Sequence, residues 1–168
     1  MRTVSFQDDV LPLKDKLFRL ALHITLNAAE AEDVVQETLI RMWQHREEWP
    51  ALQSVEAYSL TICRRLALNE AARAGHGNVT LEEYDGPAAD HTPFDQLALR
   101  EQMALVRRLI DRLPEVQRTI MLLRDIEGTP YADIARIMQL GEGQVRVYLH
   151  RARGRIKRLI EETENYGL

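Results

Sequence analysis

Four residues near the end of the chain combine side chains that can read the edges of DNA bases. Arg146, Val147, His150 and Arg151 lie within six residues of one another. In an α-helix, which turns by about 100° per residue, these positions share one side. A guanidinium can bond guanine at two points, and a small apolar side chain can contact the methyl group of thymine. This side of the helix is therefore predicted to read bases in a major groove.

The segment around these four residues is strongly basic, although the formal net charge of the chain is −4. Residues 141–160 contain six lysines and arginines and a single acid, Glu142. Such a cluster suits a polyanion, because some of the cations can contact phosphates while others reach bases. Two alternatives remain open for the segment. It could be a solvated helix face, or it could pair with the acidic first half of the chain.

The opposite side of the same helix is apolar at helical spacing. Its members are Val145, Leu149, Ala152 and Ile156. These side chains fall within an arc of roughly 60° and are expected to face the core. Residues 130–139, a turn at Leu140 and Gly141, and the basic helix have the lengths of a helix-turn-helix unit. Thr129 and Pro130 are expected to start the first of these helices, as a capping hydroxyl followed by proline.

Helical periodicity dominates the rest of the chain, and no stretch alternates apolar and polar residues for long enough to predict a strand. We therefore predict an all-α protein with two small helical domains, residues 1–73 and 94–168. Glycine and proline punctuate the polar segment 74–93, which we interpret as a flexible linker. The second domain contains the helix-turn-helix.

Further helices are expected at regular intervals. An apolar stripe from Leu13 to Ile24 ends before Asn27, which should cap the next helix together with Glu30 as a capping box. Three more helices are predicted at residues 54–73, 94–113 and 114–124.

Charged residues are unevenly distributed along the chain. Residues 1–95 contain 9 Lys and Arg against 16 Asp and Glu, whereas residues 96–168 contain 13 against 10. An acidic part thus precedes a basic part, which points to different partners for the two.

With no apolar stretch long enough to span a bilayer and no signal-like segment, we expect a cytoplasmic protein without membrane insertion.

The residues that could support catalysis or bind a metal are scattered. The single cysteine, Cys63, lies in an apolar helical pattern and is expected to be a buried thiol. The histidines show no metal-ligand spacing, and no nucleophile and base fall into a recognisable arrangement. We predict no catalytic residue, no metal site and no cofactor.

Several segments in both halves carry a family resemblance. Residues 113–128, 131–135, 142–146 and 150–153 closely resemble the C-terminal DNA-binding domain of bacterial sigma-70-type factors, above all the two-domain extracytoplasmic function group. In the first half, residues 30–43 resemble that family's polymerase-binding helix and residues 57–68 its promoter-melting helix. The resemblance covers nearly the whole chain in the same order, and it implies a transcription initiation factor.

The resemblance assigns docking on the clamp helices of the largest subunit of core RNA polymerase to one group of residues. They are Asp33, Gln36, Glu37, Ile40 and Arg41. A helix face with acids and an amide suits a partner that presents arginines. The alternative is that Asp33 and Glu37 belong to a solvated face.

Two further groups are implied to contact promoter DNA. For the element near minus thirty-five they are Gln144, Arg146, Val147, His150, Arg151 and Arg155. For the element near minus ten they are Leu52, Gln53, Ser54, Arg64 and Arg65. The loop before the third helix would capture an unstacked base, whose removal from the stack costs a few kcal/mol. The sequence does not identify which loop residue does so.

The resemblance also implies a bipartite mechanism and further partners. The first domain would dock on polymerase and help to open promoter DNA, while the second would read the upstream element and engage the polymerase flap. An anti-sigma factor that packs between the domains is implied as well. Two other classes stay open: a self-sufficient helix-turn-helix regulator that binds duplex DNA without polymerase, and a protein that mimics or sequesters part of the transcription machinery.

Overall fold

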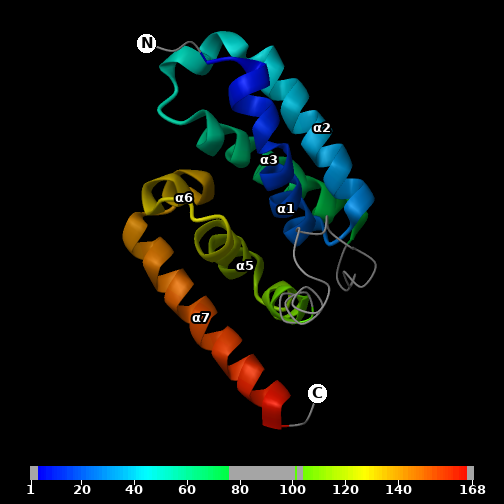
Figure 1. Ribbon diagram of the computed structural model, residues 1–168, viewed down its shortest axis with the longest axis vertical. Helices are drawn as coiled ribbons and strands as arrows, with labels where there is room; N and C mark the ends of the chain where they lie inside the picture. Colours follow the sequence, from blue (N-terminus) through cyan, green and yellow to red (C-terminus); the bar gives the residue numbers. More distant parts are fainter. Residues whose placement is uncertain (1–3, 76–100, 102–103, 166–168) are drawn as a thin grey trace, which may run out of the picture.

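The computed structural model describes residues 4–75, 101 and 104–165 of the chain (Figure 1). All regular structure within these residues is helical, as expected, and it forms two groups of helices that correspond to the two predicted domains. The interpretation of residues 76–93 as a linker, and the predicted start of a helix at Phe94, lie outside the described residues.

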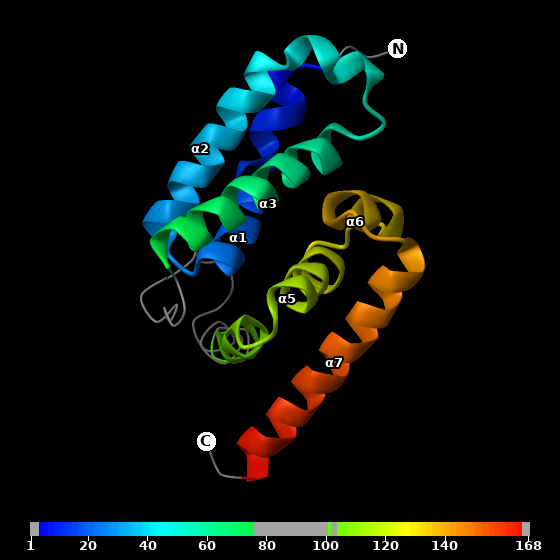
Figure 2. The same ribbon diagram turned by 180° about the vertical axis from the view of Figure 1, so that it is seen from behind.

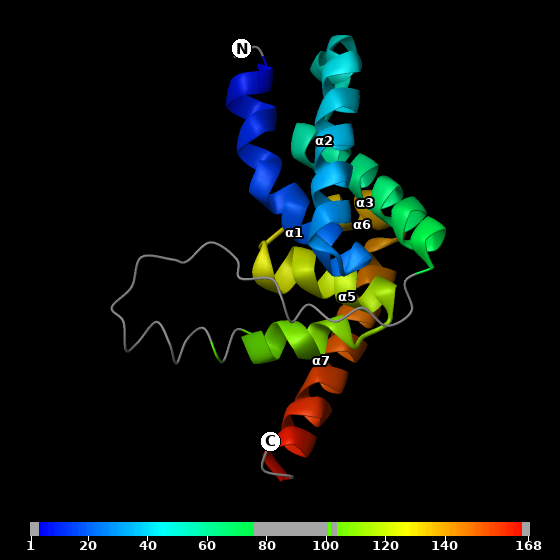
Figure 3. The same cartoon turned by 90° about the vertical axis from the view of Figure 1, so that its right-hand side faces the viewer.

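Three helices build the first domain: α1 (Lys14–Thr25), α2 (Ala28–Gln44) and α3 (Val55–Ala74). They pack against one another, and α1 and α2 lie side by side in Figure 3. A turn at Leu26, in the left-handed region with φ 56°, ends α1. The side chain of Asn27 then accepts a hydrogen bond from the backbone N–H of Glu30 at 3.0 Å, so the predicted cap of α2 is confirmed.

The end of the first domain near the N-terminus has its own small core. A π-helical turn (Phe6–Val10) packs near the short 3₁₀ segment Arg46–Ala51, which precedes α3. The buried side chains of Val10, Met42 and Trp49 form the centre of this cluster. The loop before α3 therefore packs against a cluster of aromatic and aliphatic side chains.

The second domain follows the predicted order of helices. A helix whose described part is residue 101 and residues 104–111 leads to α5 (Glu115–Met121), which continues as a π-helical turn (Leu122–Ile126). Next come α6 (Tyr131–Met138) and the long α7 (Glu142–Asn165). α7 packs on α5 and α6, on the side of these helices away from α1 to α3 (Figures 1 and 2).

One interpretation of a helix start was wrong. Thr129 does not cap α6: its hydroxyl is buried and has no hydrogen-bond partner. Pro130 occupies the cap position in an extended conformation, without a side-chain cap, and α6 begins at Tyr131. The backbone N–H of Thr129 instead bonds the carbonyl of Leu123 at 2.8 Å, which holds the residue in the turn that closes the π-helical segment.

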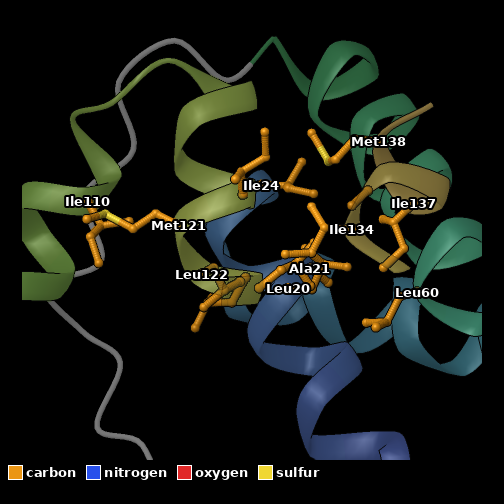
Figure 4. Close-up of a cluster of buried hydrophobic side chains, with 14 of the residues drawn as sticks. Leu20, Ala21, Ile24, Leu60, Ile110, Met121, Leu122, Ile134, Ile137 and Met138 are labelled. Carbon is orange, nitrogen blue, oxygen red and sulfur yellow. The ribbon is translucent and has the colours of Figure 1, made fainter. Parts of the chain in front are cut away.

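The two domains share one hydrophobic core. Leu20, Ala21 and Ile24 of α1 lie between α5 and α6, close to Ile134 of α6 (Figure 4). α1 contacts α5, and α3 contacts α6. The sequence predicted two small helical domains but not that they share a core, because helical periodicity reports which face of a helix is buried but not which neighbour buries it.

Candidate nucleic-acid interface

The two sides of α7 differ as its periodicity predicted. Val145, Leu149, Ala152 and Ile156 are all buried, each with 7% or less of its surface exposed. Arg146, Val147, His150 and Arg151 are all exposed. Nearly half of the surface of Val147 is open to solvent, which is unusual for a valine. α6, the turn at residues 139–141 and α7 thus present a helix-turn-helix with an open basic face.

The turn between α6 and α7 contains a residue in the left-handed conformation and a hydrogen bond from the backbone to a side chain. Gln139 adopts the left-handed conformation with φ 57° and ends α6. Gln144 then reaches back, and its Oε1 accepts a hydrogen bond from the backbone N–H of Gly141 at 2.9 Å. This is one half of a capping box, and it commits the amide oxygen of Gln144, predicted to contact DNA, to holding the start of α7.

One aromatic ring joins two of the cations in this region. The guanidinium of Arg146 lies 4.0 Å from the centre of the Tyr131 ring, and that of Arg124 lies 4.3 Å from it. Cations are attracted to the electron-rich face of an aromatic ring. Tyr131 therefore restricts the orientations of Arg146. The only sign of this role in the sequence is an aromatic residue near the start of the first helix of the helix-turn-helix.

Further along α7, Arg153 and Arg155 differ in their surroundings. Arg155 is exposed, in keeping with its predicted DNA contact. Arg153 instead donates two hydrogen bonds to the carboxylate of Asp125, with Nε 3.0 Å from Oδ2, and these bonds raise the pKa of the guanidinium. The basic helix thus pairs with its own domain at this position, rather than with the acidic first half of the chain.

The residues predicted to dock on polymerase share one exposed face of α2. Asp33, Gln36, Glu37, Ile40 and Arg41 are all exposed. At about 100° per residue they span an arc of about 140°. Half of the surface of Ile40 is open to solvent. The Nε of Arg41 donates to Oε1 of Glu37 at 3.1 Å, an exposed pair one turn apart that adds little stability.

The loop before α3 combines a structural role with exposed polar groups. Ser54 caps α3 by accepting a hydrogen bond from the backbone N–H of Ala57 at 3.0 Å. Gln53 is exposed, whereas Leu52 is half-buried against the cluster that contains Trp49. Of the three loop residues predicted to contact DNA, Gln53 is therefore the one whose side chain is open to solvent.

An aromatic group beneath this loop was not predicted. The ring of Phe6 stacks on that of Trp49 with centroids 6.4 Å apart, and it meets Trp43 edge-on at 5.6 Å. Tyr58 lies beside the loop with its hydroxyl 3.4 Å from a carboxylate oxygen of Glu48. Burial, followed by the charge of Glu48, raises the pKa of this phenol. Only the frequency of aromatic residues in these segments could have suggested the group.

The two arginines of α3 differ in their surroundings. Arg65 is exposed. Arg64 is largely buried against the second domain, where its Nε and Nη2 donate to the two carboxylate oxygens of Glu115 at 3.2 and 3.1 Å. The structure thus separates two cations that the sequence grouped together, because only the packing of the domains brings Glu115 to Arg64.

Other kinds of site are not indicated within the described residues. They contain no cluster of histidine, cysteine and acidic side chains that could hold a metal ion. Cys63 is fully buried, and burial raises the pKa of its thiol to about 12. No helix in the described part of the chain has the length and apolar character to cross a membrane.

These features define a two-domain helical DNA-binding protein, and comparisons with known proteins agree with it. Residues 10–76 match the family model of sigma-70 region 2, and residues 103–156 match that of sigma-70 region 4. The chain is 31% identical to the ECF RNA polymerase sigma factor SigL of Mycobacterium tuberculosis over 148 residues, which cover 87% of this chain and 83% of SigL. It is 30% identical to the RNA polymerase sigma-H factor of Pseudomonas aeruginosa, covering 90% of this chain and 84% of the relative.

Solved structures show the same fold. The sigma factor RpoE of Bartonella quintana, in complex with the anti-sigma factor NepR, superimposes with a TM-score of 0.74 at 20% identity, covering 93% of this chain and 96% of RpoE. CnrH, in complex with the cytosolic domain of CnrY, gives a TM-score of 0.64 at 19% identity and covers 91% and 85% of the two chains.

The chain therefore belongs to the extracytoplasmic function group of the sigma-70 family. It is a transcription initiation factor that takes part in promoter recognition, and not an enzyme. This membership decides against the self-sufficient regulator and the sequestering mimic.

Proposed function

We propose that the two domains divide promoter recognition between them. In this proposal α7 reads the element near minus thirty-five, the loop before α3 together with Arg64 and Arg65 engages the element near minus ten, and α2 docks on core RNA polymerase. The single observation that carries the proposal is the exposed basic face of α7 on a helix-turn-helix.

The composition of the α7 face supports base reading rather than phosphate contact alone. Arg146 and Arg151 provide forked donors that match guanine, and Val147 provides an apolar contact for thymine. A surface that only attracted phosphates would not require an exposed valine between cations. Gly143 and Gly154 have open space where a side chain would begin, so the DNA backbone can approach α7 closely at both positions.

The exposed face of α2 supports docking on a protein. It joins acidic groups with an apolar side chain, Ile40, that is half open to solvent. Arginines of a partner would bond the carboxylates of Asp33 and Glu37, while Ile40 supplies apolar contact area. We assign this face to the clamp helices of the largest subunit of polymerase.

The loop before α3 supports capture of an unpaired base. The Gln53 side chain is exposed, and an amide has both a donor and acceptor for the edge of a base. The hydroxyl of Ser54 accepts the capping bond of α3 but keeps its own proton for donation. We assign base capture to Gln53, with Ser54 in support, and the cost of unstacking would be offset by these contacts.

An anti-sigma partner is a further part of the proposal. RpoE of Bartonella quintana was solved with the anti-sigma factor NepR, and its fold extends over 93% of this chain. We infer that this chain also has an anti-sigma partner, and that this partner would hold it inactive by binding both domains. A cognate partner should abolish its binding to core polymerase in a competition assay, and a partner that leaves this binding unchanged would contradict the inference.

The test of the proposed function is run-off transcription with bacterial core RNA polymerase and genomic DNA fragments, with and without this protein. New discrete start sites that share two spaced upstream elements are expected. Arg151→Ala should then relax the upstream element at one base pair, at a cost of about 1–3 kcal/mol. Arg108→Ala, which removes an exposed arginine outside α7, is the matched control and should leave the element unchanged.

Docking is tested separately by binding to core polymerase. Asp33→Lys should weaken this binding without altering the sequence preference of α7. Asp15→Lys, which makes the same change at an exposed position of α1, is its control. If Asp33→Lys and Arg151→Ala failed at the same step, the proposed division between domains would be wrong.

A further inference from the structure

A turn that precedes the matched family region packs near the loop before α3. The π-helical turn Phe6–Val10 lies, except for its last residue, ahead of residues 10–76, which match sigma-70 region 2. It lies at the same end of the first domain as the loop (Figures 1 and 2), and it contacts both α2 and α3. The ring of Phe6 is half-buried in the cluster that contains Trp49. The family match therefore assigns no role to this ring.

Hydrogen bonds and burial hold this turn in place. The Oγ of Ser5 accepts a hydrogen bond from the backbone N–H of Asp8 at 3.0 Å, and the backbone N–H of Ser5 donates to Oδ2 of Asp9 at 2.8 Å. Such reciprocal bonds are those of a capping box. At the other end of the turn, Val10 is fully buried in the cluster with Trp49. The turn is therefore anchored at both ends, with Phe6 between the anchors.

The ring of Phe6 connects the loop to α2. It stacks on Trp49 at an interplanar angle of 13°, and it meets Trp43 of α2 edge-on at 79°. Aromatic pairs in such arrangements stabilise by more than the apolar area that they bury. Trp43 has support of its own, because the guanidinium of Arg46 lies 4.4 Å from the centre of its ring and donates to its carbonyl at 3.1 Å. Phe6 thus joins Trp49 to a part of α2 that is already held.

Trp49 in turn holds the backbone of the loop. Its indole N–H is buried and has no hydrogen-bond partner among the described residues, so packing orients its ring. Its carbonyl accepts a hydrogen bond from the backbone N–H of Leu52 at 3.0 Å, which ends the 3₁₀ segment immediately before Gln53. The position of Gln53 therefore depends on Trp49, and the position of the Trp49 ring depends on its stacking with Phe6.

We propose that Phe6 is a positioning residue for recognition of the element near minus ten. Its stack with Trp49 holds the loop before α3 in the conformation in which Gln53 captures an unpaired base. Phe6 does not contact DNA and acts through Trp49 and Leu52. The capture of a base rests on the proposed function of the loop, whereas the ordering of the loop by Phe6 does not. Ordering raises the apparent affinity for the base, because a larger fraction of molecules holds the loop in the competent conformation.

Amide hydrogen exchange of the free full-length chain, followed by NMR, tests the ordering of the loop. Phe6→Leu keeps an apolar side chain but removes the ring, and it should speed exchange of the Leu52 amide by about two- to tenfold, the factor that corresponds to one aromatic pair. Phe6→Tyr keeps the ring and should exchange as the wild type. Leu11→Ala, at an exposed position directly after the turn, is the matched control and should leave the rate unchanged.

Two results of this experiment would overturn the proposal, whether or not the protein directs transcription. The first is a Leu52 amide that exchanges at the same rate in Phe6→Leu and in the wild type. The second is an equal increase in Ile134→Ala, which lowers stability in the shared core without touching the aromatic cluster. That increase would assign the effect to the stability of the whole fold and not to the loop.

Run-off transcription with core polymerase, from promoters that differ only in the element near minus ten, tests the effect on recognition. Gln53→Ala identifies the captured base as the position at which discrimination is lost. Phe6→Leu should lose about two- to tenfold at the same position, while its preference at minus thirty-five and its affinity for core polymerase stay unchanged. Adding Phe6→Leu to Gln53→Ala should cause no further loss, because Phe6 acts through Gln53.

The outcomes separate this inference from the function on which it rests. A further loss in the double variant, or equal losses at both promoter elements in Phe6→Leu, would refute positioning of Gln53 by Phe6. Full discrimination in Gln53→Ala would refute base capture by Gln53 instead. In that case the exchange rate of the Leu52 amide still decides whether Phe6 orders the loop.

Discussion

The contact between Arg146 and Tyr131 leads to a quantitative prediction about base reading. Tyr131→Leu keeps an apolar side chain at the start of α6 but removes the ring, which lies 4.0 Å from the guanidinium of Arg146. A cation over an aromatic ring at an exposed site contributes about 0.5–1 kcal/mol. If the ring holds Arg146 in the orientation that reads a base, the variant should lose about two- to fivefold in discrimination at that base pair.

The assay is run-off transcription from a promoter library randomised across the upstream element. Arg146→Ala identifies the base pair that Arg146 reads, because it should cost about 1–3 kcal/mol there. Tyr131→Leu should affect the same base pair by a smaller factor. Tyr131→Phe keeps the ring and should behave as the wild type. Thermal unfolding of all three variants shows whether any loss comes from the stability of the domain.

Two results would refute this reasoning. Full discrimination in Tyr131→Leu would show that the ring does not orient Arg146. An equal loss in Tyr131→Phe and Tyr131→Leu would assign the effect to the hydroxyl or to packing instead. Arg124, whose guanidinium lies 4.3 Å from the same ring, offers an internal check, since Arg124→Ala should not create a loss at a second base pair.

Three further predictions concern stability and reactivity. Ser54→Ala should lower stability by about 1 kcal/mol in thermal unfolding through loss of the α3 cap, and Ser54→Asp should restore it, whereas a dispensable cap would leave both unchanged. Ile134→Ala, at a position with 0% exposure in the shared core, should lower the free energy of unfolding by about 2–5 kcal/mol. Spectroscopic probes placed in each domain should report the same lowered unfolding transition. A loss confined to the second domain would contradict a common core. Because burial raises the pKa of Cys63 to about 12, the reactive thiolate is scarce in the folded chain, so iodoacetamide at pH 8 should label it, by mass spectrometry, far more slowly than in urea. Fast labelling of the folded chain would contradict deep burial of the thiol. The same raised pKa makes the stability of the fold depend on pH: the contribution of the protonated thiol is fully present below the unfolded pKa, near 8.5, and is lost as pH rises toward about 12.

Much of the local structure could be predicted because it depends on neighbours in the sequence. Asn27 and Ser54 cap helices through bonds to residues three positions further on, and both have the side-chain types that favour this position. The failure at Thr129 has a tertiary cause. The chain there closes the π-helical turn through a bond to Leu123, and this leaves the hydroxyl buried away from the first turn of α6.

The candidate sites divide in the same way. Residues on one face of a single helix, such as Arg146 and Arg151 on α7, could be grouped by angle alone, since an α-helix repeats at about 100° per residue. Groups that depend on several elements could not. The stacking of Phe6 on Trp49 joins the first turn to the loop before α3, and nothing in the spacing of these residues predicts the contact.

By itself, the sequence determined the helical class, the two halves, the helix-turn-helix and the basic face of α7, because each of these follows from local periodicity and turn chemistry. Only the tertiary structure decided that the two halves share a core and that Arg64 is paired while Arg65 is free to the solvent. The partner of Arg64, Glu115, is 51 residues away in the chain. Contacts at such separations depend on how whole helices pack, and no local pattern encodes them.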